Sequence, residues 1–167
     1  MPKRAAWIGL GIASALACAS SPPVKQSLAF RQLIAIAQLD DESARRAAED
    51  ALVDVLVTQP AAVRGLQAVA SYTLFSPREL DDAAALRAQL EAAGFDGAVV
   101  LRLVSGEKRA CCGSERIVRI EASIYAVSRE TPLWSGTSGT LGPDDARERV
   151  EDLAYAVVAE LARLPLR

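Results

Sequence analysis

Residues 93–104 read Ala93-Gly94-Phe95-Asp96-Gly97-Ala98-Val99-Val100-Leu101-Arg102-Leu103-Val104, and this stretch decides the fold. Glycine is the residue type that most often ends a helix, because it accepts a left-handed backbone at the C-terminal cap. A nearly continuous apolar run follows from Gly97 to Val104. Such runs are typical of strands at the centre of a sheet that is covered on both faces. The stretch therefore predicts a helix that ends at Gly94 and leads into a central strand.

Two further strands are predicted before this stretch. A β-compatible run spans residues 27–38, with Phe30, Ile34 and Ile36 expected on one face. A second run covers residues 66–75. Both runs are long enough for ordinary strands, and each is followed by residues that favour the start of a helix.

Two helices alternate with these strands. Asp40 and Asp41 favour a helix start, and residues 43–58 follow before Pro60 stops the helix. Ser76-Pro77-Arg78-Glu79 combines a serine cap, a glutamate three residues later and a proline at the first helical position, so the second helix is predicted to start there. Four charged residues of the first helix are expected on its solvent side: Arg45, Arg46, Glu49 and Asp50.

The remainder of the chain predicts a loop, two strands and a helix. Residues 105–114 are polar and indicate a loop, residues 117–127 alternate like a strand, and residues 134–141 indicate a short strand with glycine bulges. A last helix is expected after Gly142-Pro143-Asp144-Asp145. The order β-α-β-α-β-β-β-α predicts a single α+β domain, a mixed sheet layered with three helices. We expect the first two helices on one face of the sheet.

The composition excludes several classes of function. The chain contains no histidine, which excludes Ser-His-Asp and Cys-His catalytic arrangements and histidine metal sites. It carries 19 basic and 21 acidic residues, and only 5% of its residues are aromatic. No basic stripe or aromatic platform for nucleic acid results from this composition. We therefore expect no nucleic-acid partner, no cofactor and no enzymatic activity.

The N-terminus predicts export and lipid attachment. Lys3 and Arg4 precede an uncharged apolar segment, residues 5–17, which ends at Ala17-Cys18. At about 1.5 Å per residue this segment is too short for a hydrocarbon core of ~30 Å. We expect residues 1–17 to be a lipoprotein signal peptide and residues 18–26 a tether with lipid on Cys18. Residues 27–167 then form the α+β periplasmic domain. The alternative is simple export as a soluble periplasmic protein, because Ala15-Leu16-Ala17 also fits a cleavage site.

The two remaining cysteines, Cys111 and Cys112, are adjacent in the predicted polar loop. Neighbouring cysteines seldom bond to each other, because the small ring distorts the peptide bond between them. Two thiols without a functional partner are one interpretation. The others are a redox pair such as a vicinal disulfide, an intermolecular bridge, and a soft-metal site, which would need further ligands.

Four phrases of the sequence together resemble those of a group of small bacterial outer-membrane lipoproteins of unknown function. They are Arg45-Arg46-Ala47-Ala48-Glu49-Asp50-Ala51-Leu52, Ser71-Tyr72-Thr73-Leu74, Ala93-Gly94-Phe95-Asp96-Gly97-Ala98-Val99-Val100 and Leu133-Trp134-Ser135-Gly136. The domain of that group is similar to modules of the curli-secretion lipoprotein, the TolB N-terminal domain and the outer-membrane activators of peptidoglycan synthases. The resemblance covers about residues 28–164. It implies the α+β fold and a packing role for Trp134, and it implies no catalytic residues.

These observations favour a non-enzymatic binding or scaffolding module that is anchored through Cys18 at the periplasmic face of the outer membrane. Its partner is expected to be an envelope protein. The last short strand offers an exposed edge for β-augmentation, with four candidate contact residues: Ser135, Thr137, Ser138 and Thr140. A redox or metal-handling protein that uses Cys111 and Cys112 is the alternative. An activator of a peptidoglycan synthase is a narrower version of the first hypothesis.

Overall fold

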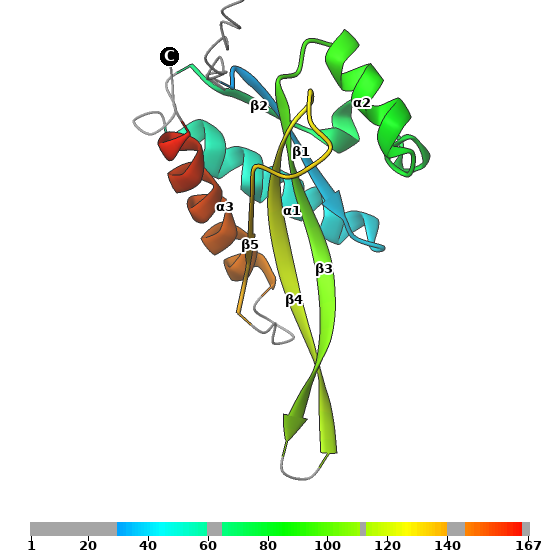
Figure 1. Ribbon diagram of the computed structural model, residues 1–167, viewed down its shortest axis with the longest axis vertical. Coiled ribbons are helices and arrows are strands. Elements are labelled where there is room, and N and C mark those ends of the chain that lie inside the picture. Colours follow the sequence, from blue (N-terminus) through cyan, green and yellow to red (C-terminus); the bar gives the residue numbers. More distant parts are fainter. Residues whose placement is uncertain (1–29, 60–64, 111–112, 140–145, 165–167) are drawn as a thin grey trace, which may run out of the picture.

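The computed structural model describes residues 30–59, 65–110, 113–139 and 146–164 (Figure 1). Its elements follow the predicted order, with two short 3-10 helices added between β2 and α2. They are β1 (Gln32–Gln38), α1 (Glu42–Thr58), β2 (Gln67–Ala70), η1 (Ser71–Thr73), η2 (Pro77–Leu80), α2 (Ala83–Ala92), β3 (Gly97–Ala110), β4 (Gly113–Ala126), β5 (Trp134–Thr137) and α3 (Ala146–Arg163). The α+β class and the single mixed sheet are thus confirmed.

The five strands lie in the order β2-β1-β3-β4-β5. β1 pairs in parallel with both β2 and β3, whereas β3, β4 and β5 pair antiparallel. The apolar run that begins at Gly97 therefore forms the central strand, as predicted. Helices are needed for the two parallel connections, because parallel neighbours cannot be joined by a tight hairpin.

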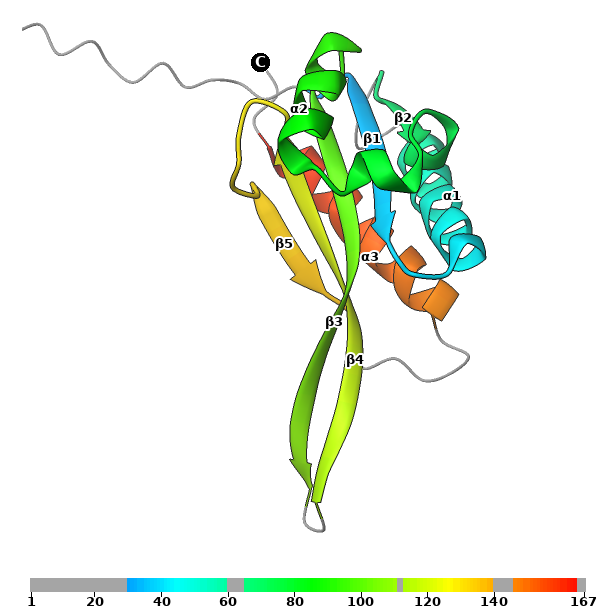
Figure 2. The same ribbon diagram turned by 90° about the vertical axis from the view of Figure 1, so that its right-hand side faces the viewer.

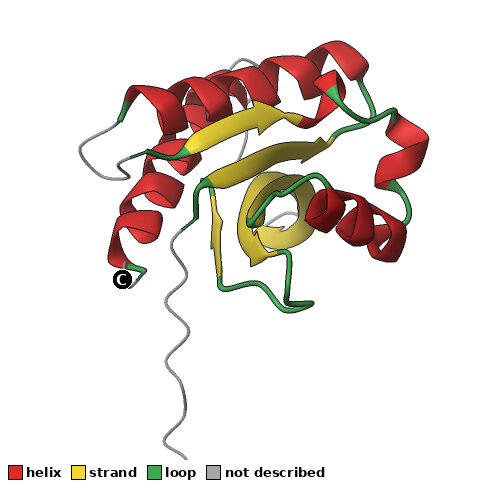
Figure 3. Cartoon of the chain, turned by 90° about the horizontal axis from the view of Figure 1, so that it is seen from above, coloured by secondary structure: helices red, strands yellow, loops and turns green. Residues whose placement is uncertain are grey.

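The helices form two layers, and this corrects the expectation that the first two share a face. α1 and α3 pack on one face of the sheet and α2 packs on the other (Figures 1 and 2). Figure 3 shows the strands between two groups of helices. The strand order gives the reason. The chain moves from β1 to β2 in one direction and then back past β1 to β3, and right-handed crossovers in opposite directions lie on opposite faces.

Two hydrophobic cores result. The larger core lies between the sheet and the pair α1 and α3, and it includes Leu33, Leu52, Val99, Ile124 and Val157, none of which is exposed at all. The smaller core lies under α2 and is built from six residues: Ile34, Ile36, Leu86, Leu90, Ala98 and Val127. Alternate residues of each central strand serve the two cores, which explains why the run is apolar on both faces.

The first strand is shorter than predicted and Phe30 lies on the other face. β1 begins at Gln32, and Phe30 belongs to the larger core rather than to the smaller core with Ile34 and Ile36. The Phe30 ring covers Gly97, where an added Cβ would lie 2.4 Å from the ring. The strict alternation assumed for residues 27–38 fails because the chain bends at Arg31 before the ladder starts.

The charged face predicted for α1 is also corrected. Arg45 and Glu49 are buried, with 6% and 0% exposed. The Glu49 carboxylate accepts hydrogen bonds from Ala37 N (2.9 Å), Ser71 Oγ (2.7 Å) and Tyr72 N (3.0 Å). It therefore joins α1 to the end of β1 and to η1. Periodicity alone cannot identify such a residue, because a buried carboxylate is tolerated only where donors converge on it.

The helix starts follow the predicted chemistry with shifted boundaries. The pKa of the Asp41 carboxyl, which caps α1, is held below its ordinary value by hydrogen bonds from the Ser43 side chain and Ala44 N. Hydrogen bonds from the Ser76 side chain and backbone lower the pKa of the Glu79 carboxyl in the predicted capping box.

That capping box opens only the short helix η2, and α2 starts later, with Asp82 as its cap. The strand predicted over residues 66–75 is likewise shorter than expected, because η1 replaces its second half. Gly94 ends α2 as predicted, with φ of 83° in the left-handed region. The local sequence signals therefore predict the correct types of element, but the predicted lengths differ from those in the structure.

The prediction of a loop over residues 105–114 is wrong. β3 continues to Ala110 and β4 starts at Gly113, so each strand has 14 residues. Pairing with β1 ends at Arg102 and pairing with β5 ends at Glu121, beyond which the two strands form a ribbon that projects from the body (Figure 2). In a two-stranded ribbon the backbone groups of the two strands pair with each other, and neither face has to be apolar because neither packs on a core. The sequence of such a ribbon is therefore polar, like that of a loop.

Candidate interaction surface on β5 and the open face of the sheet

β5 is an edge strand. It pairs with β4 through the register Glu121↔Thr137, Ala122↔Gly136, Ser123↔Ser135 and Ile124↔Trp134, and no strand of the described part of the chain lies on its other side. Ser135 and Thr137 are exposed. An unpaired edge is the feature that β-augmentation needs, because its free N–H and C=O groups can pair with a partner strand.

The register shows which backbone groups of β5 face outward. Ser138 N donates to Ile120 O at 2.8 Å, and the Ser138 hydroxyl accepts from Ile120 N at 3.0 Å, so this pair faces β4. Residues of an antiparallel strand alternate between facing their partner and facing away. Gly136 therefore faces β4, and Thr137 directs its N–H and C=O away from β4. Thr140 lies outside the described residues.

The other side of β5 is fixed to the larger core. Trp134 is partly buried against this core, and an added Cβ on Gly136 would lie 2.5 Å from the Trp134 ring. Glycine at 136 is thus needed by the indole that covers it. The one-to-one register through Gly136 shows no bulge there, contrary to expectation. The packing role expected for Trp134 is in place, and it holds the edge strand in position.

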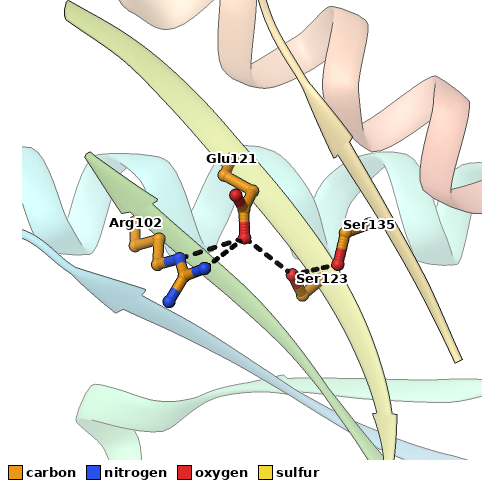
Figure 4. A network of polar contacts seen from close by, with 4 residues as sticks. All are labelled: Arg102, Glu121, Ser123 and Ser135. Carbon is orange, nitrogen blue, oxygen red and sulfur yellow. Dashed lines mark hydrogen bonds and ion pairs between the residues drawn. The ribbon is translucent and has the colours of Figure 1, made fainter. Parts of the chain in front are cut away.

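A chain of polar contacts crosses three strands from this edge (Figure 4). The Ser123 and Ser135 hydroxyls are 2.7 Å apart, and Ser123 Oγ donates to Glu121 Oε1 at 3.2 Å. The same Glu121 oxygen accepts from Arg102 Nε at 3.0 Å and from Arg102 Nη2 at 2.7 Å. Because Ser123 has one hydrogen and directs it to Glu121, Ser135 is the donor in the pair of hydroxyls.

The network is partly buried, and its two charges lie together. The Glu121 side chain is 17% exposed and the Arg102 side chain 52% exposed, and the guanidinium offsets the charge of the carboxylate. The Glu121 Oε1 oxygen accepts from Ser123 Oγ and from two nitrogens of Arg102. The network fixes the polar side chains of the open face in one arrangement and leaves Ser135 at the edge of the sheet.

The structure brings together only some of the predicted site residues. Ser135, Thr137 and Ser138 lie on or directly after β5, whereas Cys18, Cys111 and Cys112 lie outside the described residues. Among the residues that are described, no group of three or more acidic or cysteine side chains could hold a metal ion. Arg102 and Glu121 were not predicted as a pair. Arg102 is the one charged residue within the apolar run 97–104. This interruption of the run is the sequence feature that could have identified Arg102 as a candidate site residue.

The comparisons with known proteins found similarity to solved structures and to nothing else. No family model matches the chain, and no curated protein matches its sequence. The PelC dodecamer from Paraburkholderia phytofirmans is similar at 14% identity and a TM-score of 0.43, covering 84% of this chain and 91% of that chain. Lipoprotein GNA1162 from Neisseria meningitidis is similar at 14% identity and a TM-score of 0.38, covering 79% of this chain and 98% of that one.

A minor lipoprotein from Acinetobacter baumannii is similar at 16% identity and a TM-score of 0.38, covering 81% of this chain and 95% of that one. Two of these three similar structures are thus bacterial lipoproteins. Within the described ranges, no helix is both long and apolar enough to cross a membrane.

Proposed function

We propose that the protein is a lipid-anchored, non-enzymatic binding module at the periplasmic face of the outer membrane. It contacts an envelope protein partner by β-augmentation at β5. The observation that carries the proposal is the outer edge of β5, where Thr137 directs outward backbone groups that no strand of the described residues pairs with, while Trp134 holds the strand to the core. A partner strand gains main-chain hydrogen bonds at such an edge without any change in the fold.

The anchor is the second part of the proposal and rests on the signal that ends at Cys18. Two or more acyl chains give stable membrane attachment, whereas one chain does not. Cys18→Ala is expected to release the protein from membrane fractions and to remove the mass of the lipid. A variant that stays in the membrane with unchanged mass would refute the anchor, and release of the unmodified wild type would indicate simple export.

The contact at β5 is tested with two variants of one residue. Thr137→Pro removes an outward N–H and keeps every hydrogen bond to β4, since proline is tolerated at sheet edges. Thr137→Ala removes the side chain and keeps the N–H. With a photo-crosslinking amino acid at Ser135 in living cells, we expect a partner adduct in the wild type and in Thr137→Ala. The adduct should be lost in Thr137→Pro.

Circular dichroism of Thr137→Pro has to show an unchanged fold, so that loss of the adduct reports lost pairing. If Thr137→Pro retains the adduct, the partner does not add a strand at β5. If a photo-crosslinking amino acid at the exposed Glu91 on α2 gives the same adduct as Ser135, the contact is not specific to this edge.

A further inference from the structure

An open groove lies between α2 and the sheet, on the face opposite α1 and α3. It encloses about 300 Å³, which is within the range of small-molecule sites. Its wall is α2, with Leu86 and Leu90, and its floor includes Ile36, Ala98 and Val100. α2 has ten residues and a length of about 15 Å, so it covers only part of the face and leaves the groove open.

The centre of the groove floor offers no backbone groups to a ligand. It is formed by β3, which pairs with β1 on one side and with β4 on the other at Ala98, Val100 and Arg102. The N–H and C=O groups of β3 are therefore used within the sheet. An extended peptide in the groove would leave its own backbone groups without partners, which is costly in an apolar site. An unbranched hydrocarbon chain needs no such partners and matches this floor.

Cationic side chains stand at both ends of the groove. Arg102 lies five residues along β3 from Gly97, and its guanidinium is engaged by Glu121. At the opposite end, where β4 stops, Arg87 pairs with Glu130 at 3.0 Å.

Arg129 lies at that same end, is exposed and has no ion pair among the described residues. The groove is thus lined by three arginines and one glutamate on a chain whose net charge is −2. An arginine without a carboxylate partner is suited to bind a carboxylate or phosphate through two parallel hydrogen bonds.

We infer that this groove binds an anionic amphiphile with a single acyl chain, the class that includes fatty acids and monoacyl phospholipids. The hydrocarbon chain lies on the floor between Leu86 and Val100, and the anionic head is bound by Arg129 beside Arg87. This site borders the polar network of the β5 surface at Arg102 and Ser123 and does not depend on the proposed protein partner.

The test uses the full chain in lipid nanodiscs with a fatty acid that carries a photoreactive diazirine on its acyl chain. Mass spectrometry of the labelled peptides is expected to place the label on α2 and β3. Arg129→Gln should reduce the labelling by about tenfold, the effect of losing one charge-assisted contact of about 1.4 kcal/mol. Ala83→Trp introduces a large side chain at an exposed position that lines the groove and should abolish labelling without disturbing the cores.

Arg163→Gln is the matched control, because it removes the same charge from α3 on the opposite face and should leave the labelling unchanged. Unlabelled oleate and a monoacyl phosphatidylglycerol are the competitors, and the better one identifies the source of the ligand. The inference is overturned if neither competes, if the corresponding uncharged fatty alcohol labels equally well, or if the label falls outside α2, β3 and β4.

Discussion

Replacement of Glu49 by glutamine tests the account of the fold most directly. The carboxylate is fully buried, its Oε1 accepts from Ala37 N and Ser71 Oγ, and its Oε2 accepts from Tyr72 N. In Glu49→Gln one oxygen remains for the first two donors. The new NH2 group then faces the Tyr72 N–H, which is left without an acceptor.

The size of the effect follows from these three contacts. Two hydrogen bonds change from charged to neutral, a loss of about 1 kcal/mol each, and the orphaned N–H of Tyr72 costs about 1–3 kcal/mol. The sum is about 3–5 kcal/mol. It is an upper bound, because an amide is cheaper to bury than a carboxylate. A domain with a total stability of about 5–15 kcal/mol would be severely weakened.

Urea unfolding followed by circular dichroism measures this loss. Asp54→Asn is the matched control, because Asp54 is an exposed acid on the same helix and undergoes the same chemical change. We expect the control to change the free energy of unfolding by less than about 0.5 kcal/mol. If Glu49→Gln changes it no more than the control does, the carboxylate does not join α1 to β1 and η1, and the reasoning is refuted.

Three smaller predictions concern the ends and edges of elements. Gly136→Ala should destabilise the protein and expose the Trp134 indole, seen as a red shift of its fluorescence, because the new Cβ would lie 2.5 Å from the ring; an unshifted spectrum would contradict the packing. Gly94→Ala should cost about 1 kcal/mol in urea unfolding, since φ there is 83°; no measurable cost would show that the left-handed conformation is absent. Because the pKa of Asp41 and of Glu79 lies below their ordinary values of 3.8 and 4.5, both contribute stability above pH 4.5, and this contribution is lost as the pH falls through the lowered values. The double variant D41N/E79Q should therefore lose less stability on acidification than the wild type, and parallel pH curves would refute this.

Much of the fold could be predicted because its signals are local. The apolar run from Gly97, the glycine at 94 and the alternation over residues 117–127 each depend on neighbours within one strand or turn. The distribution of helices over the two faces could not be predicted in this way. It depends on whether β3 follows β2 outward or returns past β1, and no short stretch of sequence contains that information.

The candidate site was predicted in part for the same reason. Exposed hydroxyl residues on a short last strand indicated the edge at Ser135 and Thr137. The pair of Arg102 and Glu121 was missed, because its two residues are 19 positions apart and meet only through the register of the hairpin. Glu49 was misplaced, since its three donors come from β1 and from η1, and a helical wheel shows none of them.

The strand order also explains why both proposed sites involve the same side of the molecule. Because the chain returns from β2 past β1, α2 alone covers one face, while α1 and α3 together close the other. A ten-residue helix cannot cover five strands, so the rows Ile36–Val100–Ser123–Ser135 and Gln38–Arg102–Glu121–Thr137 reach beyond it. The first row changes from apolar under α2 to polar toward β5, and the second row is polar throughout. A single reversal in topology thus leaves an apolar groove and a polar edge side by side, and a longer α2 would remove the first without affecting the second.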